Sequence, residues 1–302
     1  SQIYRNFFSC FFLGNVTIYT ASAAKAYRPQ LIVEYIDDKE SILNQKTVGG
    51  SVGRALNYNV NVRTGRPTFT KPLLNIKTTA LPINLELYFD PLQANETDYY
   101  MPKGWRFNYQ QKLISNSEGY EYIDGSGLRH QFKTSYNNSN VFYDIAGTGL
   151  ILTKSGSTYT IDNGYKQTLT FDSYGRLKKI IKTVVGLQFG LQFSYVATSD
   201  NISTIYEYRK PSGATSETLT QKVSISYTGS YGFSIYSTGF PTVSVSVDSD
   251  YNLTAITEED SRVSTYGYDE EGLLSLAKSD NGEKTLFDLD ARYRMRKVND
   301  YI

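Results

Sequence analysis

The chain has few of the residue types on which several classes of protein function depend. Its 302 residues include one cysteine, one histidine, one tryptophan and two methionines. The single Cys10 excludes an intrachain disulfide and a zinc site built on paired cysteines. The formal net charge is +1, so no overall field attracts nucleic acid or an anionic membrane. No apolar run approaches the roughly 18 residues of a transmembrane helix.

Tyrosine, phenylalanine and turn-forming residues are abundant instead. The chain has 27 Tyr, 15 Phe and 23 Gly. Aromatic and β-branched residues favour pleated strands, while Gly and Asn favour the turns between them. No segment shows a helical period over about 11 residues. The composition therefore predicts an all-β protein built from antiparallel hairpins.

A short pattern recurs in the C-terminal half. An aromatic or β-branched residue precedes Asp, and in two copies Gly follows, at positions starting from 171, 247, 268 and 287. The last two intervals are 21 and 19 residues, and roughly 20 residues is the length of one hairpin with its connection. Asp can accept bonds from backbone amides two residues on, and Gly supplies the positive φ of a tight turn. The predicted turn residues are Asp172, Gly175, Asp248, Asp269, Gly272 and Asp288.

The N-terminal region allows two interpretations. Phe7–Leu13 followed by the Ala-rich stretch 21–26 has the order of a secretory signal. Polar residues interrupt the apolar part, however, and 26–35 continues as a strand in which Leu31 and Val33 share one face. Residues 37–45 are polar and charged, as expected of a linker. Both interpretations of the first 26 residues stay open.

The repeated pattern resembles a known family. Phe-Asp-Ser-Tyr-Gly-Arg-Leu at 171–177 is similar to the YD repeat of the Rhs and teneurin superfamily, and the segments 104–109 and 124–132 are similar to the Gly-Trp-Arg and Asp-Gly-x-Gly stretches that precede such repeats. The strand 28–35 resembles the closing strand of DNRLRE β-sandwich modules. The resemblance implies four regions, listed here in order: the end of a DNRLRE-like β-sandwich or N-terminal strands at 1–36, a linker at 37–45, an Rhs N-terminal β-region at 46–165 and YD-repeat hairpins at 166–302. It also implies a spiralling sheet that forms part of a hollow shell.

The sequence offers little with which to build a catalytic or metal site. The only histidine, His130, lies on a predicted strand, and we interpret it as structural. No serine lies in a nucleophile elbow. The Asp pairs 248/250 and 288/290 could ligate calcium, but both coincide with turns in which Asp is expected for backbone reasons. We therefore predict no enzyme activity, no metal and no cofactor.

Two groups of residues are candidates for binding a glycan or a protein partner. Trp105 and Tyr109 could stack on a sugar, although a core role is the simpler interpretation. Arg292, Arg294 and Arg296 alternate along a predicted strand and would share one face, where a solvated surface is the simpler interpretation.

The functional hypothesis follows from the resemblance. Rhs-like shells enclose or present a C-terminal effector, so this chain is expected to be a non-enzymatic structural segment of a secreted or cell-surface protein. Its partners would be its own effector or further repeats beyond Ile302. The autoproteolytic Asp-Pro-x-Gly-Leu motif of Rhs toxins is not carried over, because Asp90-Pro91-Leu92 lacks the Gly-Leu. The alternative is an adhesion or carbohydrate-binding surface module that uses exposed aromatics, with cell-wall or surface glycans as partners.

Overall fold

The computed structural model describes residues 47–301, apart from 63, 95–99, 136–137, 163–166, 198 and 229–231. The regions predicted at 1–36 and 37–45 lie outside the described residues. Within the described residues the chain is all-β, as predicted. Antiparallel hairpins form its sheets, and the only helical elements there are the 3-10 turns η2 (Pro91–Gln93) and η4 (Glu259–Ser261). No helix of the described part is long and apolar enough to cross a membrane.

The first five strands form a small sheet in chain order. They are β1 (Thr47–Val52), β2 (Leu56–Asn61), β3 (Pro67–Ile76), β4 (Ile83–Phe89) and β5 (Trp105–Phe107). The sequence of β4 alternates as a strand with one apolar face should, and its Ile83, Leu85, Leu87 and Phe89 are all buried. The opposite face carries Tyr88, which is also buried.

The remaining strands form a large sheet in which each strand pairs with the next one along the chain, up to β22 with β23. They are β6 (Lys112–Asn116), β7 (Gly119–Ile123), β8 (Arg129–Ser135), β9 (Asn138–Asp144), β10 (Ile151–Ser155), β11 (Thr158–Asp162), β12 (Gln167–Phe171), β13 (Leu177–Val184), β14 (Leu187–Tyr195), β15 (Ile202–Lys210), β16 (Thr218–Tyr227), β17 (Gly232–Ser237), β18 (Phe240–Val247), β19 (Leu253–Thr257), β20 (Val263–Tyr268), β21 (Leu274–Lys278), β22 (Lys284–Leu289) and β23 (Met295–Tyr301). This order lets each hairpin form from neighbouring sequence.

The large sheet meets itself at β6. Lys112 forms an isolated antiparallel bridge with Arg176, the residue just before β13, and the amide of Leu113 donates to the carbonyl of Gly175 over 2.7 Å. The hairpins from β6 to β12 therefore form a ring, which the turn between β12 and β13 closes.

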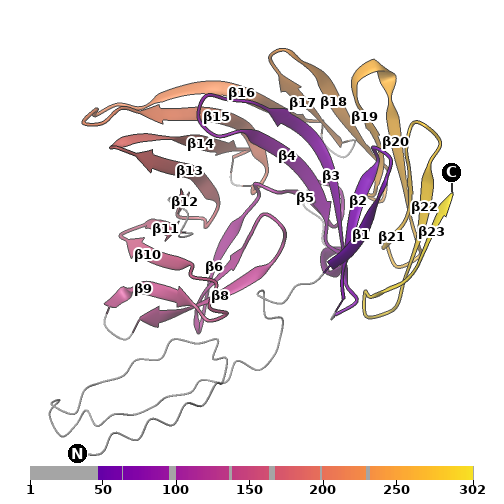
Figure 1. Cartoon of the computed structure of the whole chain (residues 1–302), viewed down its shortest axis with the longest axis horizontal. Helices are drawn as coiled ribbons and strands as arrows, with labels where there is room; N and C mark the ends of the chain where they lie inside the picture. The colour runs from indigo at the N-terminus through magenta and orange to yellow at the C-terminus, as the bar shows by residue number, and fades with distance from the viewer. Residues whose placement is uncertain are drawn as a thin grey trace, which may run out of the picture.

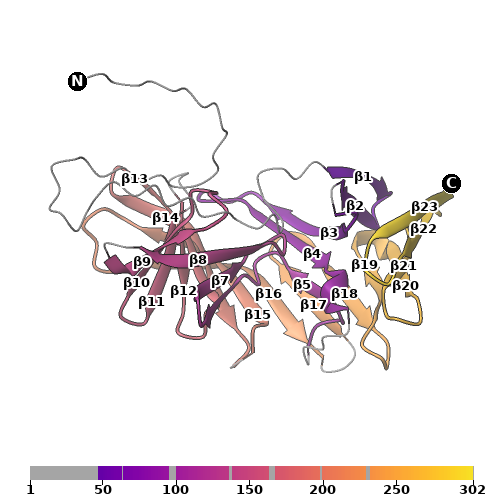
Figure 2. The same cartoon turned by 90° about the horizontal axis from the view of Figure 1, so that it is seen from below.

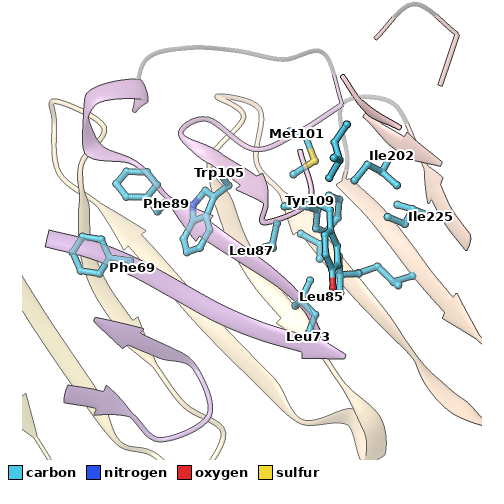
Figure 3. Packing of buried hydrophobic residues seen from close by; sticks show 14 of the residues in the cluster. Phe69, Leu73, Leu85, Leu87, Phe89, Met101, Trp105, Tyr109, Ile202 and Ile225 are labelled. Atoms are coloured by element: carbon cyan, nitrogen blue, oxygen red, sulfur yellow. The ribbon is translucent and has the colours of Figure 1, made fainter. Parts of the chain in front are cut away.

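The strands that follow this ring curve into an arc, and the small sheet lies inside the arc (Figure 1). In the turned view the small sheet lies between the β6–β12 hairpins and the β19–β23 hairpins (Figure 2). The apolar face of the small sheet and the inner face of the arc share one core, part of which is shown in Figure 3. Its ring contacts join the two sheets: Phe69 lies 4.9 Å from Phe287, and Phe107 lies 5.3 Å from Phe233. Burying a side chain of this size contributes roughly 1.5–3 kcal/mol.

Candidate functional site

One kind of turn recurs along the large sheet, and we call it the Asp turn. Its first residue is Asp, whose Oδ1 accepts the backbone N–H groups of the residues two and four positions on. In the copy at Asp172 these are the amides of Tyr174 at 2.9 Å and Arg176 at 3.0 Å. The same bonds are made by Asp124, Asp172, Asp248, Asp269 and Asp290. Because the carboxylate satisfies two turn amides, Asp fixes the place at which the strand reverses.

The last Asp turn begins two residues later than the sequence pattern placed it. Asp288, which we expected in the turn, lies in β22 and is exposed, while Asp290 accepts the amides of Arg292 and Arg294. Asp248, Asp269 and Asp290 are consequently spaced 21 residues apart. The fourth position of each Asp turn has positive φ. It is Gly in three of them, but Tyr251 (φ 65°) and Tyr293 (φ 61°) fill it in the other two.

The fifth residue of an Asp turn can add a side-chain bond to the second carboxylate oxygen. Arg176 Nε lies 2.9 Å from Asp172 Oδ2, and Arg294 Nε lies 2.7 Å from Asp290 Oδ2. The Arg294 bonds hold the pKa of Asp290 down at about 2. Arg176 is buried and also donates to the carbonyl of Ser199. These arginines are therefore structural ties within the sheet.

At Asp124 a histidine takes the place of that tie. The fifth residue of the turn is leucine, and Asp124 Oδ2 instead lies 3.1 Å from His130 Nε2. His130 Nδ1 lies 3.8 Å from Asp144 Oδ2, which is an ion-pair distance but too long for a hydrogen bond. Burial lowers the pKa of His130, but its interactions with Asp124 and Asp144 outweigh burial and raise that pKa to about 9. An imidazolium held between two carboxylates cannot accept a proton at neutral pH, so this group is a charged tie and not a general base.

Arg106 and Tyr88 face the Asp124 turn from the small sheet. They are paired across β4 and β5, and the Arg106 guanidinium lies 4.3 Å from the centre of the Tyr88 ring. Burial first, and the nearby Arg129 second, lower the pKa of Arg106 to about 10. A Cβ on Gly127 would lie 2.9 Å from Arg106 Nη2 and 3.2 Å from the Tyr88 hydroxyl. The glycine therefore allows the turn to lie directly over this pair.

A cavity of about 160 Å³ opens beside the turn. Its walls come from segments far apart in the sequence: β2 and β3, the end of β4 with η2, the Asp124 turn, and the last Asp turn. Backbone bonds hold these segments together, since the amide of Met295 donates to the carbonyl of Gly65 over 2.8 Å. The cavity thus depends on both sheets being assembled.

A second cavity of about 420 Å³ lies between β3, β18 and η4. Its lining includes Lys71, which is buried and whose Nζ lies 3.0 Å from Glu258 Oε1 and donates to the carbonyl of Arg54. Burial lowers the pKa of Lys71, and Glu258 opposes that change. The lysine is fully engaged in tying β3 to η4.

The structure places the predicted aromatic pair in the core. Trp105 is 3% exposed, and its Nε1 donates to the hydroxyl of Tyr268. Tyr109 is 8% exposed, and its hydroxyl accepts the amide of Asn84 at 3.1 Å. In the folded protein neither ring is available to stack on a ligand.

The three predicted arginines do not share a strand. Arg292 and Arg294 belong to the last Asp turn, and Arg296 alone lies in β23. All three are exposed. The predicted stripe is therefore replaced by one turn residue, one arginine bound to Asp290, and one strand residue. Among the described residues no group of three or more His, Cys, Asp or Glu could hold a metal ion.

Sequence reasoning missed Tyr88 and Arg106. The signal was present for Tyr88, because the alternation of β4 places it on the face opposite Leu87 and Phe89. Nothing local indicated that this second face would also be covered, since the hairpin that covers it lies about 40 residues further along the chain.

Comparison with known proteins adds no assignment. No protein-family model matches the chain, and no curated protein matches it. The candidate function therefore rests on the residues and their geometry.

Proposed function

We propose that the chain is a non-enzymatic wall segment of a secreted or cell-surface protein of the Rhs/YD-repeat type, whose curved sheet encloses or presents a C-terminal effector. The observation that carries this proposal is the large sheet itself. Its strands follow chain order, and its Asp turns recur at a spacing of 21 residues at the C-terminal side.

Such a sheet suits a wall for a physical reason. Each hairpin pairs with the one before it, so hairpins can be added without changing the existing pairs, as in other repeat proteins. The Asp carboxylate satisfies two amides inside each turn, so the turn needs no support from a separate domain. Strand twist then curves the growing sheet.

The small sheet would act as a plug in this wall. It lies inside the arc and buries Phe89 and Trp105, whose rings contact Tyr268 and Tyr266 of β20. The space for an effector would therefore be formed by hairpins other than those that cover the plug. This assigns the described part of the chain to a closed end of the shell.

The native gene product tests this proposal. Its intact mass and C-terminal sequence should show a chain well beyond 302 residues, with more aromatic-Asp-x-x-Gly-Arg-Leu copies and an unrelated tail. In limited proteolysis the tail should survive in the full product and be cut rapidly when expressed alone. A product without further hairpins, or a tail cut equally fast in both forms, would overturn the enclosure.

A matched pair of variants sharpens the proteolysis experiment. Asp248→Ala and Asp269→Ala together remove two turn carboxylates and should expose the tail to protease. Asp250→Ala and Glu270→Ala change neighbouring exposed side chains of the same turns and should leave the tail protected. Equal protection in both variants would mean that the tail is shielded by something other than this sheet.

A surface-binding role is the second candidate. Trp105 and Tyr109 cannot serve it, because both are buried. The observation that favours it is the cavity beside the Asp124 turn, where a small ligand has room.

A further inference from the structure

One hairpin tip of the large sheet exposes aliphatic side chains at its outermost point. In the β13–β14 hairpin Val185 is 97% exposed, and Val184 and Leu187 beside it are 44% and 42% exposed. The hairpin ends on the side of the arc away from the small sheet (Figure 1). None of the three residues belongs to the core of the described part of the chain. We call these three residues the aliphatic tip.

The backbone at the aliphatic tip is unfavourable for valine. Val184 pairs with Leu187, and the two residues between them have positive φ, 46° at Val185 and 77° at Gly186. This is the pattern of a type I′ turn, whose first position favours Asn, Asp or Gly. A β-branched residue is strained there. The chain therefore keeps an exposed valine where asparagine would give a more stable turn, and such a local conflict points to a role outside the fold.

Lysine side chains flank the aliphatic tip on both faces of the sheet. Lys182 lies three residues before Val185, and Lys210 pairs with Gln188, three residues after it. Because the strand register is unbroken here, Lys182 and Lys210 project from opposite faces. Among the described residues, neither ammonium group forms an ion pair with a carboxylate. A strand rises roughly 3.3 Å per residue, so the backbone of each lysine lies about 10 Å behind Val185.

The acidic residues of the adjoining β15–β16 hairpin are already engaged. Glu207 is buried, lies 3.0 Å from Lys222 Nζ and also accepts the amide of Thr79. Glu217 lies 2.7 Å from Lys179 Nζ. The charge left around the aliphatic tip is therefore positive, although the formal net charge of the whole chain is only +1.

The convex shape and the charge together favour a lipid surface as the partner. A two-residue turn is narrow, so a protein partner would need a pocket matched to it, whereas the interface of a bilayer accepts an apolar protrusion without one. Amphipathic segments bury their apolar side about 5–10 Å into the boundary between headgroups and acyl chains. With the aliphatic tip at this depth, the two lysines reach the level of the lipid phosphates.

We propose that the aliphatic tip is a peripheral membrane-docking site, in which Val184, Val185 and Leu187 enter the headgroup boundary of an anionic bilayer while Lys182 and Lys210 contact its phosphates. The aliphatic side chains supply apolar burial and the lysines supply electrostatic attraction, so the affinity depends on both groups. The proposal is independent of the wall function, because the tip can dock whether or not the sheet encloses an effector.

Co-sedimentation of the 302-residue chain with vesicles tests the partner. One set of vesicles is phosphatidylcholine alone, and the other is an equal mixture of phosphatidylcholine and phosphatidylserine. We expect binding to the mixture to be about tenfold tighter and to weaken as salt rises from about 0.1 to about 1 M. No binding to the mixture at roughly 1 mM lipid, or equal binding to both sets, would overturn the proposal. A protein pocket as the true partner would give the first of these results.

Val185→Asn separates docking from folding, because its two readouts should move in opposite directions. Asn is favoured at this turn position, so Tm should rise. The same substitution removes the outermost aliphatic side chain, so binding to the mixed vesicles should weaken about tenfold. Unchanged vesicle binding would contradict the proposal, and a lower Tm with unchanged binding would show that the valine serves the fold.

Charge variants test the flanking lysines. Lys182→Gln with Lys210→Gln should weaken binding to the mixed vesicles about tenfold. Its control, Lys178→Gln with Lys297→Gln, removes two exposed charges elsewhere in the large sheet and should leave binding unchanged. A second control is Tyr174→Ser, which removes an exposed ring from the Asp turn at the opposite end of β13. Equal loss of binding in a control that still melts cooperatively would overturn the assignment to the aliphatic tip.

Discussion

The indole nitrogen of Trp105 donates a hydrogen bond of 2.8 Å to the hydroxyl of Tyr268, joining β5 of the small sheet to β20 of the large one across 163 residues. Trp105 is buried, and burial raises the pKa of Tyr268, so the phenol stays neutral and can accept the bond. It is one of the polar links between the two sheets, together with the 2.7 Å bond that the Tyr266 hydroxyl donates to the carbonyl of Ala55.

Replacing Trp105 with phenylalanine removes this donor and part of the ring. We expect the free energy of unfolding in urea to fall by about 1–3 kcal/mol, because the Tyr268 hydroxyl is left buried without its donor. A double-mutant cycle with Tyr268→Phe isolates the bond, and the coupling should be about 1 kcal/mol. Additive effects of the two substitutions would show that the loss comes from packing alone.

The carboxylate of an Asp turn should matter far more than its neighbours. Asp269→Ala leaves the amides of Glu271 and Leu273 without their acceptor, and we expect a loss of about 1–2 kcal/mol in unfolding free energy. Glu271→Ala changes an exposed side chain in the same turn and should stay within about 0.5 kcal/mol of the parent. At the last turn, Asp290→Ala should destabilise the protein more than Asp288→Ala. The reverse order would mean that the last turn begins at Asp288, as the sequence pattern predicted.

Stability should fall between neutral and mildly alkaline pH because of His130. Its pKa is raised from an ordinary 6.5 to about 9 in the folded protein, so its ion pairs contribute fully below about pH 6.5 and are lost as pH rises through 9. Urea unfolding at pH 6.5 and 9 should differ by about 3 kcal/mol from this group. In His130→Gln that difference should disappear. A parent protein whose stability does not change over this range would show that the imidazole is neutral when folded.

Gly175 lies where the ring of hairpins closes. Comparing its replacement with that of Gly282 separates the cost of backbone strain at positive φ from the cost of a steric clash. A Cβ there would lie 1.9 Å from the carbonyl oxygen of Leu113, so Gly175→Ala must break the contact between β6 and the β12–β13 turn. Gly282 also has positive φ, but a Cβ on it would meet nothing within 4 Å. We expect Gly282→Ala to cost about 1–2 kcal/mol from backbone strain and Gly175→Ala to cost clearly more. Equal losses in thermal unfolding would mean that the ring closure contributes nothing to stability.

Much of the fold could be predicted from local sequence. Period-two alternation located strands such as β4, and Asp with Gly located the turns at Asp172 and Asp269, because both signals act over a few residues. The last turn was misplaced for the same reason. Asp288 and Asp290 both follow strand-like residues, so either could begin the turn. A Gly at the positive-φ position would have identified the correct Asp, but that position is occupied by Tyr293.

The arrangement of the two sheets could not be predicted. Local sequence does not show whether the large sheet will cover Trp105 and Tyr109. Their burial depends on the curvature of the arc, which brings distant strands over the small sheet. The same holds for Arg106, whose burial depends on the turn between β7 and β8, where Gly127 lies against its guanidinium. Such long-range packing leaves no local pattern.

The separation of Trp105 and Tyr268 in the sequence also means that the two partners of this bond are synthesised at different times. Ribosomes add about 5–20 residues per second, so the 163 residues between the two partners take roughly 8–33 s to make. Throughout that interval Phe89 and Trp105 lack their β20 partners Tyr268 and Tyr266, while each later hairpin can pair with its predecessor as soon as it emerges. Until β20 emerges, the nascent chain therefore exposes the part of the small sheet's apolar face that the β20 residues Tyr266 and Tyr268 cover in the folded protein.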